Sequence, residues 1–219
     1  MIYHTHRDFY VVQKPSGLGM HQDGDAVGII SVLNELTAEQ LFPVHRLDKE
    51  TSGLLLVARH QAAAAEFGRL FESRAIEKYY LAIGGTKPNK KQGAIVGDMV
   101  KARNGSWRLT PDKSNPARTY FFSHGTHMGG RLYVLRPVTG RTHQLRVALK
   151  SIGVPIHGDR RYKGQEAARL QLHASALRFD WQGEPQTFVN LPQASEQFLA
   201  PDWEAFEKVA TPWDYSWPR

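Results

Sequence analysis

The distribution of apolar and polar residues along the chain predicts a protein built mainly from β-strands. Short apolar runs of strand length recur, and several end at Gly or Pro residues that mark turns. The run from Gly53 to Arg59 is continuously apolar up to its last residue, so we expect a central strand that is buried on both faces. Between residues 84 and 123 the pattern breaks into short β-type pieces. The other strand-like segments lie at residues 8–13, 78–83, 132–135, 172–179 and 188–189.

Three segments have the spacing of helices instead. Residues 28–36 and residues 61–74 each carry one apolar stripe, and the second segment is rich in alanine. Residues 141–152 predict a helix with Leu145 and Leu149 on an apolar face and Arg146 on a polar face. Because strands dominate and helices interrupt them irregularly, the sequence predicts a mixed α+β fold in a single domain.

Residues 192–219 form an aromatic and proline-rich tail, which we expect to pack against this domain. Three of the five tryptophans lie in it, at Trp203, Trp213 and Trp217. Stacking on RNA bases is the alternative role for these rings. The acidic balance of the chain beyond Trp181 argues against that role and favours packing.

Composition excludes several classes of protein and of site. The 219 residues include no cysteine, which rules out disulfides, thiolate metal ligands and cysteine nucleophiles. The ten histidines show no compact ligand spacing, so no metal is expected. No apolar stretch approaches the roughly 20 residues that span a bilayer, and the first residues do not resemble a signal peptide. We therefore expect a cytoplasmic protein that has no membrane partner.

The charge of the chain indicates a polyanionic partner. The formal net charge is +7, with two blocks rich in Lys and Arg. Residues 84–120 hold eight basic residues against two acidic ones, and residues 141–169 hold seven against two. Beyond Trp181 the sign reverses. Such a polarised distribution favours a protein with one nucleic-acid face.

The best candidate for chemistry is the string His45-Arg46-Leu47-Asp48-Lys49-Glu50-Thr51-Ser52-Gly53. It places a carboxylate and an arginine between two apolar segments, where a loop held by rigid strands can carry a reactive group. A structural ion pair between Arg46 and Asp48 is the alternative interpretation. The string itself does not decide between them.

The motifs of the chain, taken together, resemble those of the RluA-type pseudouridine synthases from about Asp8 to Phe206. The string around Asp48 is similar to the family signature. Lys14-Pro15-x-Gly17-Leu18-x-x-His21 resembles the first motif and Lys78-x-Tyr80-x-Ala82 the second. The third is similar to Pro137-x-Thr139-Gly140-Arg141-Thr142-His143-Gln144-Leu145-Arg146-Val147, continuing into Ile152-Gly153-x-Pro155-Ile156-x-Gly158-Asp159-x-x-Tyr162 and Arg169-Leu170-x-Leu172-His173-Ala174.

This resemblance implies the pseudouridine synthase catalytic fold, with a mixed, largely antiparallel sheet and flanking helices. It implies an RNA pseudouridine synthase that needs no cofactor and flips its target uridine out of the stack. Asp48 corresponds to the catalytic aspartate, which must be ionised in a partly dry pocket, and Arg146 corresponds to the cation that pairs with it. Tyr80 corresponds to the tyrosine that stacks on the uracil, whereas Tyr79 should point to the opposite face of its strand.

The remaining site residues follow from the same resemblance. Arg46 either enters the space left by the flipped base or pairs with Asp48, and both roles stay open. Leu172 is expected to bind substrate, and Arg141, His45 and Lys78 are expected to contact RNA. The attack by Asp48 on the sugar, its addition to the uracil ring and the abstraction of a sugar proton all need the same carboxylate, so the route stays open.

The expected partner is structured RNA, either ribosomal or transfer RNA, and the expected state is a monomer. Two other functions are considered: a non-catalytic RNA-binding or RNA-folding protein on the same scaffold, and a hydrolase that uses His45 and Asp48. Many relatives carry a small RNA-binding domain before the catalytic one, for which the residues ahead of Asp8 leave no room. The family commonly has a histidine where Ala148 stands. We expect this difference to alter local packing or RNA contact and to leave the reaction intact.

Overall fold

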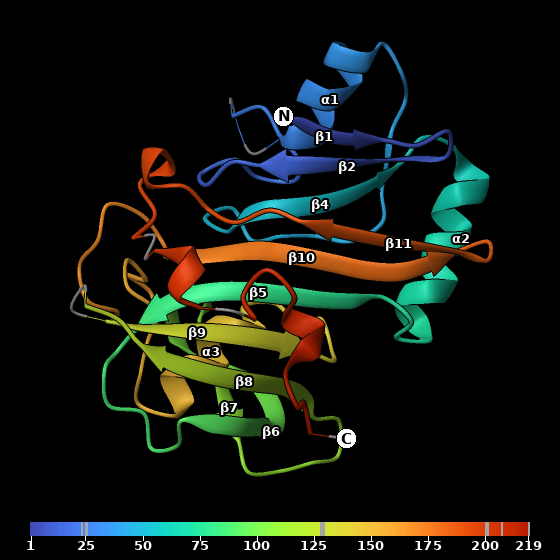
Figure 1. Ribbon diagram of the computed structural model, residues 1–219. Helices are drawn as coiled ribbons and strands as arrows, with labels where there is room; N and C mark the ends of the chain where they lie inside the picture. Colours follow the sequence, from blue (N-terminus) through green and yellow to red (C-terminus); the bar gives the residue numbers. More distant parts are fainter. Residues whose placement is uncertain (23, 25, 128–129, 200–201, 207, 219) are drawn as a thin grey trace. The chain divides into compact units, whose positions relative to one another are not determined.

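The computed structural model describes residues 1–22, 24, 26–127, 130–199, 202–206 and 208–218 (Figure 1). The chain forms two compact units. Unit 1 comprises Met1–Glu77 and Leu177–Asn190, and unit 2 comprises Lys78–Ala176 and Leu191–Arg219. Each unit is thus assembled from separate parts of the chain. That the whole chain is one domain stays a prediction.

Unit 1 contains antiparallel strand pairs and two helices. Its first strands are β1 (Ile2–Thr5), β2 (Phe9–Lys14), β3 (Phe42–Pro43) and β4 (Ser52–Ala58), and its helices are α1 (Ile29–Thr37) and α2 (Gln61–Glu72). Strand β11 (Glu184–Val189) pairs with β10 (Leu172–Trp181), and the second half of β10 belongs to this unit. The order β1-β2-β4 places Lys14 opposite Gly53. All seven residues of β4 are buried, as its apolar run predicts.

The core of unit 1 gathers aromatic rings from segments far apart in the sequence. Phe9 of β2 meets Phe67 of α2 edge to face, with 5.4 Å between ring centroids. Phe67 in turn stacks on Trp181 at 4.3 Å. Offset and edge-on rings of this kind add stabilisation beyond the burial of their area. The core therefore joins β2 and β10 to α2.

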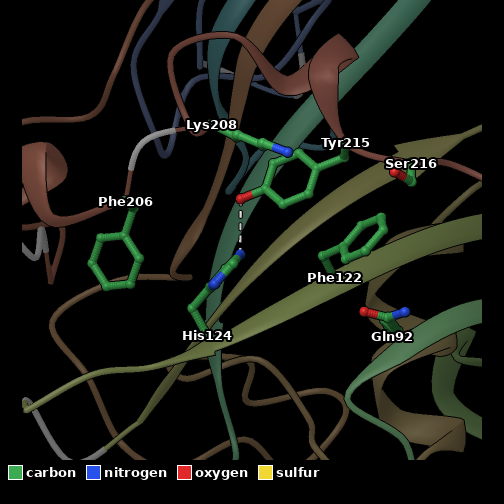
Figure 2. Close-up of a pocket in the computed structure, with 7 residues that line it drawn as sticks. All are labelled: Gln92, Phe122, His124, Phe206, Lys208, Tyr215 and Ser216. Carbon is green, nitrogen blue, oxygen red and sulfur yellow. Dashed lines mark hydrogen bonds between the residues drawn. The ribbon is translucent and has the colours of Figure 1, made fainter.

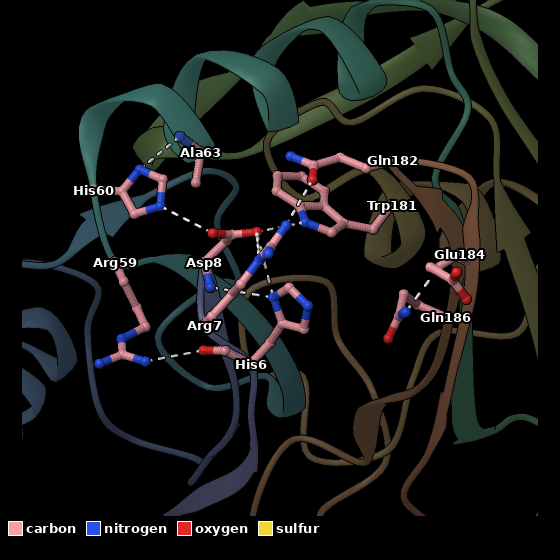
Figure 3. Close-up of polar contacts among 10 residues, drawn as sticks. All are labelled: His6, Arg7, Asp8, Arg59, His60, Ala63, Trp181, Gln182, Glu184 and Gln186. Carbon is pink, nitrogen blue, oxygen red and sulfur yellow. Dashed lines mark hydrogen bonds and ion pairs between the residues drawn. The ribbon is translucent and has the colours of Figure 1, made fainter.

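A polar cluster around Asp8 lies at the edge of this core (Figure 3). The Asp8 carboxylate accepts a hydrogen bond from Trp181 Nε1 at 2.9 Å and lies 3.2 Å from His60 Nε2. His60 also caps α2, because its Nδ1 accepts a hydrogen bond from Ala63 N at 3.2 Å. Burial works to raise the pKa of Asp8, but hydrogen bonds from Trp181, His60 and Arg7 outweigh it and leave that pKa below its ordinary value.

We expect Asp8→Asn to lower the free energy of unfolding by about 1–2 kcal/mol at pH 7, because the hydrogen bonds lose their charged acceptor. A carboxylate with a lowered folded-state pKa stabilises above its unfolded pKa and ceases to do so as pH falls through the folded value. Urea unfolding should therefore give the same difference between wild type and variant at pH 7 and pH 5, and a smaller one at pH 3. Asp180→Asn is the control, since among the described residues the Asp180 carboxylate accepts a hydrogen bond from Gly183 N alone, in an exposed turn of the same unit. An unchanged difference at pH 3 contradicts the prediction.

Unit 2 also contains a set of antiparallel strands. Its strands are β5 (Glu77–Gly84), β6 (Gln92–Lys101), β7 (Trp107–Thr110), β8 (Ala117–Gly125) and β9 (Arg131–Pro137), in the order β5-β9-β8-β6-β7, with the first half of β10 beside β5. The stretch that sequence divides into short pieces contains β6, a strand of ten residues. Position 97 within β6 requires glycine, because a Cβ there would come within 2.2 Å of Thr110 O on β7. The glycine thus permits a close strand contact rather than marking a turn.

Strand register defines the two faces of the unit 2 sheet. Tyr80 pairs with Leu135, which pairs with Phe121, so these three side chains share one face. Ala117 lies on the same face and packs against Val147 of α3 (Gln144–Ser151). Helix α3 therefore covers the face of the sheet to which Tyr80 belongs.

The C-terminal segment covers the opposite face of this sheet. Leu81 pairs with Val134, and both pack in a cluster with Phe198, Val209 and Tyr215. Three short 3₁₀ turns, Ala194–Glu196, Trp203–Ala205 and Pro212–Asp214, shape this segment. Its aromatic residues form part of the core of unit 2.

The observed elements confirm the α+β class, with three α-helices among the described residues and largely antiparallel pairing. Helix α3 begins at Gln144 rather than at Arg141, since His143 adopts a left-handed conformation with φ 59°. No helix in the part of the chain that the structure describes is long and apolar enough to cross a membrane.

Candidate active site

Asp48 lies in the loop that joins β3 to β4 in unit 1. The loop closes in a turn, since Thr51 N donates to Asp48 O at 3.0 Å. Leu47 is buried and anchors the loop, whereas Asp48 is half-buried and Arg46 is exposed. Alternation of this kind holds the backbone in place and leaves the polar side chains accessible.

A buried lysine holds this loop in place through hydrogen bonds. The Lys14 side chain is fully buried, and its Nζ donates to Pro15 O at 2.9 Å, to Leu18 O at 2.7 Å and to Lys49 O at 3.0 Å. A buried ammonium is costly unless its hydrogens are bonded, so three carbonyl acceptors explain how it is tolerated. Lys14 therefore joins the turn of the first motif to the residue that follows Asp48.

Two further hydrogen bonds join the same segments. Gly17 N donates to Lys49 O at 2.9 Å, and Ser16 Oγ donates to Glu50 O at 2.7 Å. Sequence analysis assigned no role to Lys14. The signal was present, since a lysine at the buried end of a strand, followed by Pro, must find acceptors close by.

His45, expected to contact RNA, makes structural contacts in unit 1. Its Nε2 accepts a hydrogen bond from Leu56 N at 2.8 Å, and its ring lies 5.1 Å from that of Phe71. These contacts tie the signature loop to β4 and to α2. A role for His45 in RNA contact stays a prediction.

Tyr80 and Tyr79 occupy opposite faces of β5 in unit 2. The Tyr79 ring lies 6.4 Å from Trp213 and 5.9 Å from Trp217, so it belongs to the face covered by the C-terminal segment. Tyr80 points to the face covered by α3. Leu172 is buried at the start of β10, directly after Gln171, whose carbonyl accepts a hydrogen bond from Ile83 N of β5 at 3.1 Å.

The side chain of Gln144 organises the loop that precedes α3. Its Oε1 accepts from Thr139 Oγ1 at 2.7 Å and from Arg141 N at 3.1 Å, and its Nε2 donates to Arg118 O at 3.1 Å and to Thr119 Oγ1 at 3.0 Å. The amide thus uses both of its hydrogens and both acceptor positions. A buried amide satisfied in this way fixes the loop relative to β8.

Arg146 is buried and bound by a carboxylate of the same unit. Its Nε donates to Asp159 Oδ2 at 2.7 Å and its Nη2 to Asp159 Oδ1 at 2.9 Å. The carboxylate also accepts from Tyr162 N at 3.1 Å, and the guanidinium lies 5.1 Å from the Tyr162 ring. The two parallel hydrogen bonds set the plane of the guanidinium. The expected pairing of Arg146 with Asp48 joins residues of different units and stays a prediction.

The polar face expected for residues 141–152 is exposed only in part, since Thr142 and Lys150 are exposed whereas Arg146 is buried. Gln144 and Arg146 are both buried, which is possible because hydrogen bonds satisfy these two polar side chains. Leu145 and Val147 are buried as well. Ala148, where the family commonly has a histidine, is also buried. This burial favours an effect on packing, and the consequence of the alanine stays a prediction.

Lys78 and Arg141 lie on segments that meet at the loop before α3. Burial lowers the pKa of the Lys78 ammonium, whose Nζ would lie 3.7 Å from a Cβ placed at Gly140. Arg141 Nη2 donates to Asn115 Oδ1, and Arg161 Nη1 donates to Asn104 O. These two contacts join the basic blocks at residues 84–120 and 141–169, so both blocks contribute to the same part of unit 2.

The structure thus groups the predicted residues in two sets. Asp48, Arg46 and His45 share one loop of unit 1. The second set belongs to unit 2 and comprises Lys78, Tyr80, Arg141, Arg146 and Leu172. Sequence analysis missed Lys14 and Asp159 as the residues that hold Asp48's loop and Arg146, although both stand in the motifs.

Comparison with known proteins identifies the class. The family model described as RNA pseudouridylate synthase matches residues 8–151, more than half of the chain. The sequence is 43% identical over 211 residues to an "Uncharacterized RNA pseudouridine synthase" of Haemophilus influenzae, covering 95% of this chain and 93% of that protein. It is 33% identical over 160 residues to "Ribosomal large subunit pseudouridine synthase C" of Rickettsia bellii, covering 69% of this chain and 52% of the relative.

A solved structure agrees with the sequence matches. "Human RNA Pseudouridylate Synthase Domain Containing 4" superposes with a TM-score of 0.74 at 27% sequence identity, covering 90% of each chain. The chain therefore belongs to the RNA pseudouridine synthase family, and the resemblance to its RluA-type members is confirmed. It is an RNA pseudouridine synthase, an isomerase that modifies RNA.

Proposed function

We propose that this enzyme converts one specific uridine of a structured RNA into pseudouridine, with Asp48 as the catalytic residue. The reaction breaks the bond between the sugar and a ring nitrogen, turns the base and joins the sugar to a ring carbon. That carbon loses its hydrogen as a proton and the released nitrogen gains a proton, so the product is an isomer of uridine. The observation that carries the proposal is the fixed loop of Asp48. Lys14 Nζ donates to Lys49 O of this loop and to Pro15 O and Leu18 O of the neighbouring turn, Leu47 is buried, and Asp48 between these anchors is half-buried. A carboxylate held in this way is ready to react without reorganising its backbone.

The other residues take positioning and binding roles. Tyr80 stacks on the flipped uracil, and Leu172 adds apolar contact to the base. Arg146, oriented by Asp159, supplies positive charge that favours the ionised form of the Asp48 carboxylate. Arg46 is exposed beside Asp48, which suits it to enter the space that the flipped base leaves in the RNA.

Ribosomal RNA is the substrate we favour over transfer RNA. The relative from Rickettsia bellii carries a name that specifies the large ribosomal subunit, although this chain spans about half of its length. The basic segments joined through Arg141 and Arg161 supply positive charge for an RNA backbone. His45 and Lys78 are secondary candidates for RNA contact.

The proposed function is tested by mapping pseudouridines in the ribosomal and transfer RNA of a strain that lacks the gene and of its parent. We expect one or a few sites to disappear from ribosomal RNA and to return when the wild-type gene is supplied. A site missing from transfer RNA instead would correct the substrate. Identical maps from the two strains would contradict the proposal.

A further inference from the structure

A pocket of about 570 Å³ lies in unit 2 between the sheet and the C-terminal segment (Figure 2). This volume falls within the roughly 300–1,000 Å³ of ligand pockets. Strands β6 and β8 supply one side of the pocket, and described residues of the C-terminal segment supply the other. The described lining residues are Gln92, Phe122, His124, Phe206, Lys208, Tyr215 and Ser216.

The pocket lies on the sheet face opposite to that of Tyr80. Gln92 pairs with Phe122, and Phe122 pairs with Val134, which in turn pairs with Leu81. Residues directly opposite one another share a face, and neighbours along a strand do not. Tyr80 therefore points away from the pocket, and a uridine stacked on Tyr80 cannot occupy it.

Aromatic rings form the firm part of the wall. Phe122 lies 4.7 Å from the Tyr215 ring and 5.0 Å from the Trp217 ring. Trp217 is itself held, because its Nε1 donates to Pro212 O at 2.7 Å. Phe206 lies across the pocket, with its ring 5.6 Å from that of His124. Such rings give a flat ligand a surface on which to stack.

The polar groups of the pocket suit a ligand with a neutral head and a negative charge. Tyr215 Oη and His124 Nε2 are hydrogen-bonded at 2.8 Å. Burial and the nearby Arg131 lower the pKa of His124, and burial raises the pKa of Tyr215 to about 12, so both are neutral at pH 7. Gln92 adds an amide and Ser216 a hydroxyl. Among the described lining residues the one fully charged side chain is Lys208, and none is acidic.

The surroundings of the pocket are basic. Lys90 and Lys91 are exposed and directly precede Gln92 in the chain. The Arg131 guanidinium donates to Ser123 O at 3.1 Å, next to His124 on β8. An RNA strand that reached this side of unit 2 would therefore meet positive charge before it reached the aromatic wall.

We propose that this pocket binds one nucleotide of the substrate RNA, distant from the uridine that reacts, with the base stacked against Phe206 and the phosphate contacting Lys208. The inference rests on the proposed function for its RNA ligand. A second anchor of this kind selects RNA molecules whose shape brings an unstacked nucleotide to it while the target uridine reaches Asp48. A free nucleotide offers the same chemical groups as a nucleotide within RNA, and the test below distinguishes these two ligands.

The test measures binding of a 20-nucleotide single-stranded RNA of mixed sequence to the full chain by fluorescence anisotropy over a range of salt concentrations. Lys208→Gln should weaken binding and lower the slope of log K against log salt by about 0.7, the contribution of one phosphate contact on a single strand. Arg69→Gln, which removes an exposed cation from α2 of unit 1, is the matched control and should leave the slope unchanged. A wild-type slope for Lys208→Gln overturns the proposal.

Two further measurements locate the contact. Phe206→Leu keeps an apolar side chain against the core but removes the ring, and should lower affinity about 5-fold at a temperature where circular dichroism shows the variant to be folded. Irradiation of wild type with the same RNA containing 4-thiouridine should crosslink peptides that include residues 202–218. Crosslinks confined to other peptides overturn the proposal, as does UMP binding that depends on Lys208 when RNA binding does not. If RNA binding depended on Lys208 but deletion of the gene changed no pseudouridine map, the proposed function would be wrong and the inferred pocket would stand.

Discussion

Asp48→Asn is expected to bind RNA as the wild type does and to form no detectable pseudouridine, with turnover lowered by about 1,000-fold or more. An amide has nearly the shape of the carboxylate but is neither a nucleophile nor a base at neutral pH. The loop should keep its conformation, because Lys14 Nζ donates to the backbone carbonyl of Lys49 and Thr51 N donates to the backbone carbonyl of Asp48. The substitution changes neither of these carbonyls.

Glu50→Gln provides the matched control for this variant. Glu50 is the other acid of the signature, is exposed, and accepts from Ser16 Oγ through its backbone carbonyl. The same chemical change two residues away should leave turnover within a few-fold of wild type. Pseudouridine formation is followed on RNA from the deletion strain, and binding on the same RNA. If Asp48→Asn retained turnover near that of Glu50→Gln, another residue would have to carry the reaction.

Strands and helices with a strong local pattern could be predicted from the sequence. The apolar run before Arg59 forms β4, and the alanine-rich stripe forms α2, because each segment buries one whole face or both. The pattern failed at β6, where buried positions alternate but Gly97 occupies one of them in place of an apolar residue. Gly97 looks like a strand breaker in sequence, yet its missing side chain is what lets β7 approach. Such a contact depends on a partner strand that local sequence does not specify.

The candidate site follows the same division. The motifs located Asp48, Tyr80 and Arg146 by type and spacing, and the alternation of β5 separated Tyr80 from Tyr79. The support beneath them could not be predicted. The three carbonyls that accept from Lys14 belong to two different segments, and no side-chain pattern marks a backbone acceptor. Arg146 was predicted correctly as a polar residue of α3, but its burial depends on Asp159, which lies beyond the helix.

Asp159→Asn is expected to lower the free energy of unfolding by about 3–5 kcal/mol and to reduce pseudouridine formation sharply. The carboxylate is fully buried and accepts from three N–H groups, two on Arg146 and one on Tyr162. An amide in either orientation turns its own N–H₂ toward at least one of these donors. The guanidinium is then left buried with part of its charge uncompensated, which costs more than a lost surface pair.

Asp98→Asn is the control for the chemical change, since Asp98 accepts from Ser114 N and Asn115 N in the same unit without a guanidinium partner. It should cost about 1 kcal/mol by urea unfolding. The double variant Arg146→Met with Asp159→Leu separates stability from catalysis, because apolar replacement of a buried ion pair restores much of the stability. We expect this variant to unfold at a higher urea concentration than Asp159→Asn and still to form no pseudouridine. Turnover regained together with stability would show that Arg146 supports the fold alone and that the charge near Asp48 comes from elsewhere.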